Sequence, residues 1–133
     1  MAVRIVRLGS ARARGEGLRL GTVRRPPRGI PKSAIARRDY FDVRLPELAP
    51  GAAVVSWALA TSWTPERWRK FARLYRREMG EPHARQLIAT LAALSHQTNF
   101  SVGCYCADAA HCHRILLREL LVSAGASMAR SRP

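Results

Sequence analysis

Hydrophobic and polar positions along this 133-residue chain predict strands near its start and helices in its second half. Apolar and charged residues alternate through residues 3–8 and 18–23, and both stretches end in turn signals, as strands do. The short apolar run 100–106 is typical of a buried strand. Residues 39–46 alternate at first, but the prolines that follow favour an extended, irregular segment.

The clearest helix is predicted over Pro65–Met79. Thr64 suits the N-cap and Pro65 the first helical position, and we expect Gly80 to end the helix in the left-handed conformation. Apolar residues at helical spacing predict one buried stripe, made of Trp68, Phe71, Ala72, Tyr75 and Met79. A second helix, over 82–96, is expected to run nearly antiparallel to the first.

Shorter elements complete the predicted pattern. Residues 33–37 indicate a helical turn with Ser33 as its cap, and the alanine-rich stretch 51–61 indicates a short helix. A last helix should begin near Cys112 and stop at Gly125. Its expected apolar face consists of Ile115, Leu116, Leu120 and Ala124.

These elements predict a single α/β domain over residues 1–126, whose first 17 residues form a basic strand and loop. The sheet should be small and mainly parallel, built from the segments near Val3, Leu18 and Phe100. The segment near Tyr40 can join it, and three to four helices should flank it. Residues 127–133 are polar and expected to form a disordered tail.

Charge adds a preference for anionic partners. The formal net charge is +14, from 23 Lys and Arg against 9 Asp and Glu. Residues 1–38 hold ten arginines and one lysine against one glutamate, which gives +10 of that total. This permits binding to nucleic acid or another polyanion. An unselective solvated surface, with arginines that reflect a GC-rich coding sequence, is the alternative.

The chain contains no apolar run of membrane-spanning length, and arginines interrupt its start where a signal peptide needs an apolar stretch. We therefore expect a cytoplasmic protein that does not contact membranes. Its three cysteines fall within nine residues, 104–112. In that compartment reduced thiols or metal ligands are favoured over a disulfide framework.

The cysteine-bearing stretch is the main candidate for chemistry. Cys104 and Cys106 are two apart on a predicted strand, so their side chains should project to one face. Cys112, His113 and Arg114 should follow at a helix start, beside the carboxyl end of that strand, where open α/β sheets bind ligands. A helix N-terminus favours a thiolate or a bound anion.

Three interpretations of this stretch remain open. Thiolates from Cys104, Cys106 and Cys112, with the imidazole of His111 or His113, would suit zinc or iron, although the spacing differs from the usual paired C-x2-C arrangement. Alternatively, Cys106 or Cys112 is a nucleophile with a histidine as base. In the third interpretation Cys104 and Cys106 are buried structural residues.

Four separated motifs between Leu18 and Gly125 resemble the DUF488 family, whose function is unknown. They are Arg24–Gly29, Arg38–Asp42 with Leu45–Pro50, Trp68 and Phe71 with Tyr75, and Cys104–Cys106 followed by Cys112–Arg114. The resemblance implies a small cytoplasmic bacterial α/β protein. Members usually have tryptophan where this chain has Arg44, which should either move the segment toward solvent or place a cation beside Asp42.

Together these observations predict one anion-accepting pocket, formed where the loop 24–29 meets the Cys-His-Arg segment. Arg25, Arg28 and Arg114 would bind an anionic ligand such as a nucleotide or a nucleic-acid phosphate, and Asp42 would orient an arginine. Cys106, Cys112 and His113 would supply catalytic reactivity, or would bind a metal together with Cys104. The alternatives are a non-enzymatic nucleic-acid-binding module that uses the basic first third of the chain, and an interaction protein without a site.

Overall fold

Strand β4 (Phe100–Cys104) lies inside a four-stranded sheet, and all five of its residues are buried. The computed structural model, which describes residues 1–130, gives the strand order β1-β4-β2-β3 with every pair parallel. The other strands are β1 (Val3–Arg7), β2 (Leu18–Gly21) and β3 (Val43–Arg44). The predicted small parallel sheet is confirmed, although β2 and β4 end two residues earlier than expected.

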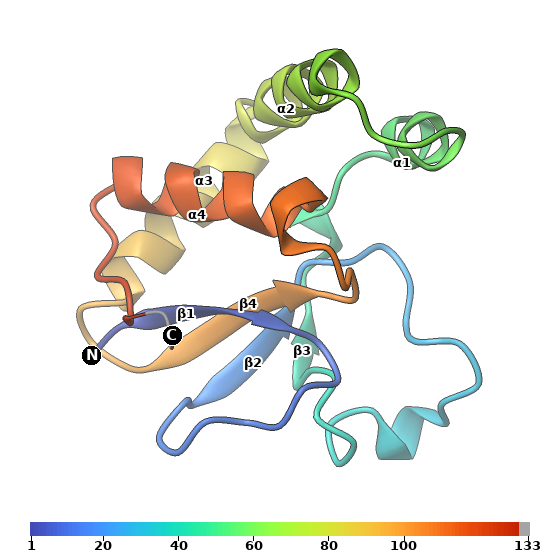
Figure 1. The fold of residues 1–133 in the computed structure, drawn as a ribbon. Helices are drawn as coiled ribbons and strands as arrows, with labels where there is room; N and C mark the ends of the chain where they lie inside the picture. Colours follow the sequence, from blue (N-terminus) through green and yellow to red (C-terminus); the bar gives the residue numbers. More distant parts are fainter. Residues whose placement is uncertain (131–133) are drawn as a thin grey trace.

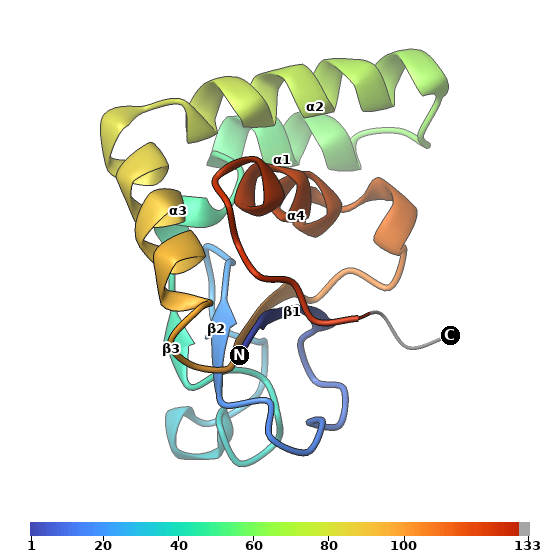
Figure 2. The same cartoon turned by 90° about the vertical axis from the view of Figure 1, so that its left-hand side faces the viewer.

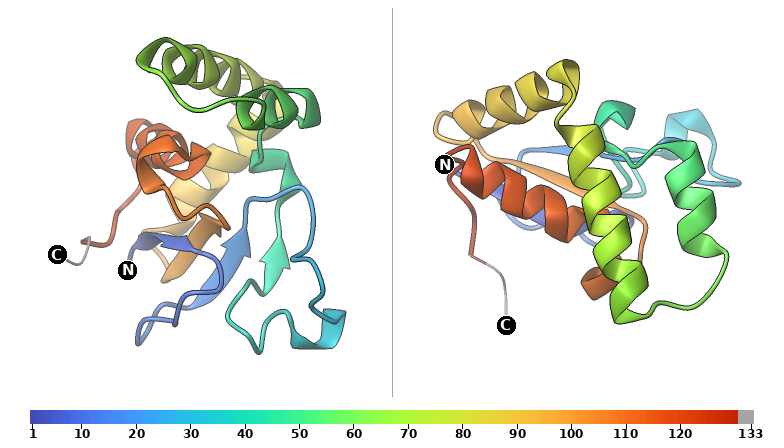
Figure 3. Two further views of the ribbon diagram at one scale, coloured as in Figure 1. Left: turned by 45° about the vertical axis from the view of Figure 1, so that its right-hand side comes forward. Right: turned by 90° about the horizontal axis from the view of Figure 1, so that it is seen from above.

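Four helices gather on one face of this sheet, and the connections 8–17 and 22–42 lie against the other face (Figure 1). The helices are α1 (Ala52–Leu59), α2 (Pro65–Met79), α3 (Pro82–Leu94) and α4 (His113–Ser123). Short 3-10 turns cover Lys32–Ala34, Pro46–Leu48 and Ala109–His111. Seen from above, α4 lies over the strands and α1 stands to one side (Figure 3). Within residues 1–130 every helix is too short or too polar to cross a bilayer.

Helix α2 has the boundaries that the sequence predicts. The hydroxyl of Thr64 accepts a hydrogen bond from the Arg67 N–H at 3.1 Å, which satisfies one unpaired N–H of the first turn. Its predicted stripe is buried, except that Trp68 is only half-buried. The prediction for Gly80 is wrong, because its φ is −79° and its N–H still bonds to the carbonyl of Arg76 at 3.0 Å.

Helix α3 does not double back along α2 as expected. Figure 2 shows it leaving the end of α2 steeply toward the sheet. Only Gly80 and Glu81 separate the two helices, and the buried side of α3, which includes Ile88 and Leu91, joins the same core as Phe100. The need to bury that face against the sheet, and not against α2 alone, sets the direction of α3.

Helix α4 begins after its N-cap Cys112, and Gly125 follows it with φ +91°, as predicted. Its buried face differs from the expected one. Ile115 is 39% exposed, whereas the buried residues are His113, Arg114, Leu116, Leu117 and Leu121. Sequence periodicity missed this rotation because the two polar residues at the helix start do not count toward an apolar face.

Two further predictions about turns and ends need correction. Ser33 makes no capping hydrogen bond, and Pro31 takes the N-cap position of that turn. The chain after residue 126 was expected to be disordered, but Val3 donates to the Ser127 carbonyl at 2.9 Å and Ala129 donates to the Val3 carbonyl at 2.8 Å. Unpaired backbone groups along the edge of β1 account for this pairing. Residues 131–133 of the expected tail lie outside the described residues.

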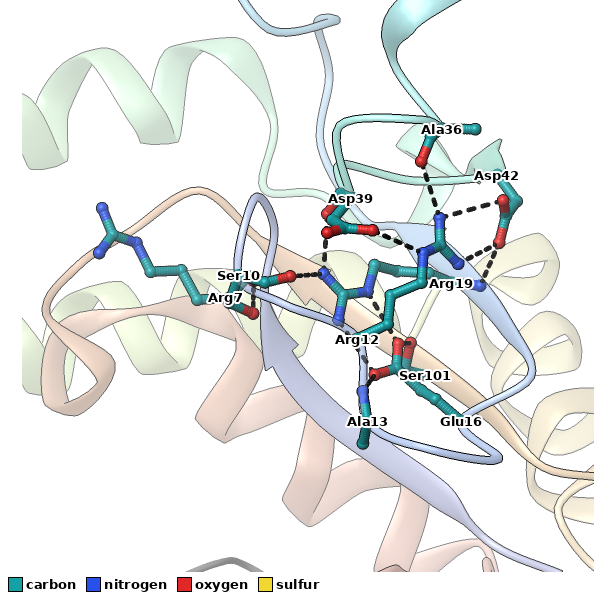
Figure 4. A network of polar contacts seen from close by, with 10 residues as sticks. All are labelled: Arg7, Ser10, Arg12, Ala13, Glu16, Arg19, Ala36, Asp39, Asp42 and Ser101. Atoms are coloured by element: carbon teal, nitrogen blue, oxygen red, sulfur yellow. Dashed lines mark hydrogen bonds and ion pairs between the residues drawn. The ribbon is translucent and has the colours of Figure 1, made fainter.

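A buried ion pair holds the connection 8–17 against the face of the sheet opposite the helices (Figure 4). Arg19 is fully buried and binds Glu16 through Nε–Oε2 at 2.8 Å and Nη2–Oε1 at 3.0 Å. Its Nη1 donates to the carbonyls of Ser10 and Asp39, both at 2.7 Å, and Ser101 Oγ donates to Glu16 at 2.6 Å. Burial by itself raises the pKa of Glu16, but the Arg19 and Ser101 hydrogen bonds outweigh it and lower the pKa to about 2.

Candidate functional site

The carboxyl ends of β4 and β2 lie side by side, and the chain leaves them toward opposite faces of the sheet (Figure 1). β4 leads into α4 on the helix-covered face. β2 leads into the connection 22–42, whose Phe41 lies against the backbone of Gly21 on the other face. In parallel sheets a crevice opens at such a reversal, and ligands bind there.

All three cysteines meet at the carboxyl end of β4. Cys104 ends β4, Cys106 follows in the loop, and Cys112 is the N-cap of α4. Their three sulfur atoms lie within 4.8 Å of one another. Cys104 and Cys112 are buried and Cys106 is exposed, so one sulfur of the cluster reaches solvent. Three cysteines in this arrangement could hold a metal ion.

The three thiols differ in their affinity for a proton. Hydrogen bonds from Cys104 and Cys112 lower the pKa of Cys106, and the charge of Arg114 acts in the same direction. The pKa values of Cys104 and Cys112 are raised, because each shares hydrogen bonds with the other sulfurs of the cluster and because burial disfavours their ionisation. The exposed Cys106 is therefore the first of the three to become a thiolate.

The side chain of Arg114, in the first turn of α4, lies against this cluster. It is 7% exposed, and its Nη1 donates to the carbonyls of Cys106 at 2.9 Å and Cys104 at 3.4 Å. The same nitrogen lies 4.0 Å from the Cys104 sulfur. Among residues 1–130, no carboxylate forms an ion pair with Arg114. A buried cation needs a counter-charge, and the cysteine sulfurs are the groups beside it that can supply one.

His113 is the first residue of α4 and lies beside the cluster. Its Nε2 is 2.8 Å from the Thr22 carbonyl and 3.1 Å from the Thr22 hydroxyl, so we assign the proton to Nε2. Its Nδ1 then carries a lone pair and lies 4.0 Å from the sulfur of Cys112. Burial lowers the pKa of His113 to about 4, which keeps the ring neutral near pH 7.

The other histidine of the segment, His111, takes no part in the cluster. Its Nδ1 lies 2.8 Å from Asp108, and its ring stacks on Trp63 with centroids 5.5 Å apart. Trp68 meets the same ring edge-on at 5.4 Å. Of the two histidines that the sequence proposed as ligands, only His113 therefore approaches a cluster sulfur.

The proposed arginines divide between two cavities. Arg25 and Arg28 line a cavity of about 1070 Å³ together with Tyr105, whose hydroxyl donates to the Arg25 carbonyl at 2.8 Å. The loop 24–29 thus meets the cysteine loop through Tyr105. Arg114 lines a second cavity, of about 520 Å³, beside β1.

Asp42 orients an arginine, but one outside the cysteine segment. Its carboxylate binds both terminal nitrogens of Arg12, at 2.8 and 3.1 Å, and accepts from the Arg19 N–H at 2.8 Å (Figure 4). The Arg12 hydrogen bond lowers the pKa of Asp42. Arg44 is exposed and donates to the carbonyl of Arg24, so it ties β3 to the loop 24–29 and does not lie beside Asp42 as a free cation.

Two residues of this region were missed at the sequence level. Thr22 follows β2 directly and fixes the proton of His113. Tyr105 stands between two cysteines and links their loop to Arg25. The alternation of strand residues could have indicated that Tyr105 faces away from Cys104 and Cys106, toward the opposite face of the sheet. No local signal marks Thr22, because its role depends on the pairing of β2 with β4.

The chain was compared with known proteins. No curated protein matches it significantly, and neither does any solved structure. A family model described as the active DUF488-N3 subclade matches residues 3–125, which include all four strands, all four α-helices and the three cysteines. The chain belongs to the DUF488 family, as the sequence motifs predicted.

Proposed function

We propose that the chain is a metal-binding protein whose Cys104, Cys106 and Cys112 hold one thiophilic divalent ion, zinc or iron. The observation that carries this proposal is the convergence of three sulfur atoms within 4.8 Å at the carboxyl end of a parallel sheet. A tetrahedral zinc with bonds of about 2.3 Å to sulfur needs its sulfurs about 3.8 Å apart. The three sulfurs, which lie within 4.8 Å of one another, are at most about 1 Å beyond that spacing.

The charges around the cluster favour such an ion. Three thiolates and a divalent cation carry a net charge of −1, and the buried guanidinium of Arg114, 4.0 Å from the Cys104 sulfur, balances it. The N-terminus of α4 adds partial positive charge where Cys112 caps the helix. Both features stabilise thiolates, which are the form that binds metal.

His113 is the protein group best suited to a fourth coordination position. It is neutral, its Nε2 proton is held by the Thr22 carbonyl, and its Nδ1 lone pair is on the side of Cys112. Metal-binding histidines commonly have the second nitrogen fixed in this way by a carbonyl. If the ring does not move, the fourth position is left to solvent or a ligand, which is the arrangement of a catalytic zinc.

Cobalt(II) titration of reduced, metal-stripped protein tests this proposal. We expect sulfur-to-cobalt charge-transfer absorption that saturates at one equivalent and disappears when zinc is added. Cys106→Ser, at the exposed position, should weaken binding at least tenfold, whereas His111→Gln should not change it, since His111 lies outside the cluster. Absence of the absorption in folded wild-type protein, or an equal effect of both variants, would contradict the proposal.

A second function is favoured by the exposure of a single sulfur. Cys106 reaches solvent while two buried thiols and Arg114 surround it, as expected for a nucleophilic cysteine. In this alternative the cluster binds no ion. Rapid alkylation of Cys106 at pH 6 in metal-free protein, combined with no cobalt absorption, would favour it over the metal site.

A further inference from the structure

The two cavities beside the cysteine segment share two lining residues, Arg7 and Ser10. Arg7 lines both the 520 Å³ cavity along β1 and the 1070 Å³ cavity at the loop 24–29. Its Nε donates to the carbonyl of Tyr105 at 3.3 Å. Because the two cavities meet at Arg7 and Ser10, we treat them as one concave surface from the β1 edge to the loop 24–29. We call this the arginine groove.

The arginine groove concentrates positive charge that carboxylates do not neutralise. Seven arginines line it outside the ion pairs of the described chain, namely Arg4, Arg7, Arg25, Arg28, Arg114, Arg118 and Arg130. The one acidic side chain in its lining is Glu16, which is buried and already bound to Arg19. Arg12 also lines the groove, but Asp39 and Asp42 hold it.

Elsewhere on the described surface some arginines are paired with carboxylates and others, such as Arg73 and Arg77, are not. Arg76 pairs with Glu119 at 3.0 Å, and Arg69 lies 3.6 Å from Glu66. The groove brings several unpaired arginines together on a concave surface. Charges gathered in this way attract a polyanion more strongly than isolated ones, so the groove is where a polyanion gains the most.

Two aromatic side chains lie in the lining of the arginine groove. Tyr40 and Tyr105 both line the groove, with ring centroids 6.2 Å apart in an edge-on arrangement. Both residues are half-buried, and the Tyr105 hydroxyl is engaged by Arg25, which leaves part of each ring for contact. Arginines that track a phosphate backbone, interleaved with rings on which unpaired bases stack, are the features of surfaces that bind single strands.

We infer that the arginine groove binds single-stranded nucleic acid, with phosphates on its arginines and an unpaired base against Tyr40 or Tyr105. The strand would pass the loop that carries Cys106, because Tyr105 belongs to both the groove and that loop. This inference does not depend on a metal in the cysteine cluster. The main binding surface would be the basic first third of the chain, which supplies Arg4, Arg7, Arg25 and Arg28.

Fluorescence anisotropy with a labelled 20-nucleotide thymidine strand and a uridine strand tests the inference on the full chain. Each phosphate contact on a single strand contributes about −0.7 to the slope of log K against log salt. The triple variant Arg7→Ala, Arg25→Ala, Arg28→Ala should therefore flatten the slope by about 2 and lose at least tenfold in affinity at low salt. Circular dichroism and thermal melting verify that each variant is folded.

The matched control removes the same charge from the exposed side of α2, through Arg69→Ala, Arg73→Ala and Arg77→Ala. It should bind within about threefold of the wild type, since these arginines lie outside the groove. Equal losses in the two triple variants, or no saturable binding by the wild type at low salt, would overturn the inference. Equal competition by inorganic polyphosphate at matched charge would overturn the assignment to nucleic acid, because it offers no bases for the tyrosines.

Discussion

Replacing Glu16 by glutamine should destabilise the fold severely, because it leaves the fully buried Arg19 without a counter-charge. Glu16→Gln keeps the size of the side chain but removes its charge and converts an acceptor facing Arg19 into a donor. Lowering the Glu16 pKa from 4.5 to about 2 corresponds to about 3 kcal/mol, at about 1.36 kcal/mol for each pH unit. Removing one partner of a buried pair costs about 3–5 kcal/mol in other proteins, which agrees.

Urea denaturation followed by circular dichroism measures this loss as a change in the free energy of unfolding, and a fall in Tm of about 10 °C should accompany it. Glu47→Gln is the matched control, because Glu47 is exposed and the same charge is removed. We expect a change below about 0.5 kcal/mol for the control. A loss below about 1 kcal/mol in Glu16→Gln, similar to that of the control, would refute the structural role of the pair.

Three further predictions follow from single features of the fold. In acid titrations, the contribution of Glu16 to the free energy of unfolding should be fully present above pH 4.5 and be lost as the pH falls toward about 2. The reason is that only the ionised carboxylate, which the fold favours, makes this contribution. Glu16→Gln should lack this part of the acid profile. Thr64→Ala should cost about 1 kcal/mol in urea denaturation by removing the N-cap of α2, and Thr64→Ser should recover most of it. Gly17→Ala should destabilise the chain by more than about 1 kcal/mol in the same assay, because Gly17 has φ +80° and an added Cβ would lie 2.0 Å from the Asn99 carbonyl oxygen. Gly15→Ala is the control and should cost less, since Gly15 also has a positive φ, +72°, but an added Cβ would meet no atom within 4 Å.

Local rules predicted those elements whose signals are contiguous in the sequence. Helix α2 has its N-cap, its stripe and the glycine that follows it within seventeen residues, and its boundaries are confirmed, although Gly80 is not left-handed. The strands of the sheet were also predictable, because alternating and short apolar patterns are contiguous and end in turn signals. The direction of α3 and the rotation of α4 were not, since each depends on how a helix face meets the finished core.

The candidate site, too, could be predicted from the sequence only in part. Strand alternation placed Cys104 and Cys106 on one face, and the helix start placed Cys112 and His113 nearby, so the cluster could be anticipated. The burial of Arg114 beneath the sulfurs could not, because an arginine at a helix start is normally solvated.

The arginines of the loop 24–29 show what tertiary structure adds. Sequence reasoning placed Arg25 and Arg28 together with Arg114 in one pocket, whereas the structure distributes them between two adjoining cavities that share Arg7 and Ser10. The side-chain direction of Arg7, at the end of an edge strand, cannot be inferred from spacing alone.

The metal content of the purified protein tests the central claim most directly. Zinc and iron are quantified by inductively coupled plasma mass spectrometry in protein prepared under reducing conditions without chelator, beside folded Cys106→Ser protein. The three-sulfur site predicts about one ion per chain in the wild type and a substantial loss in the variant. A wild-type protein without zinc or iron, or a variant that retains the full amount, would contradict it.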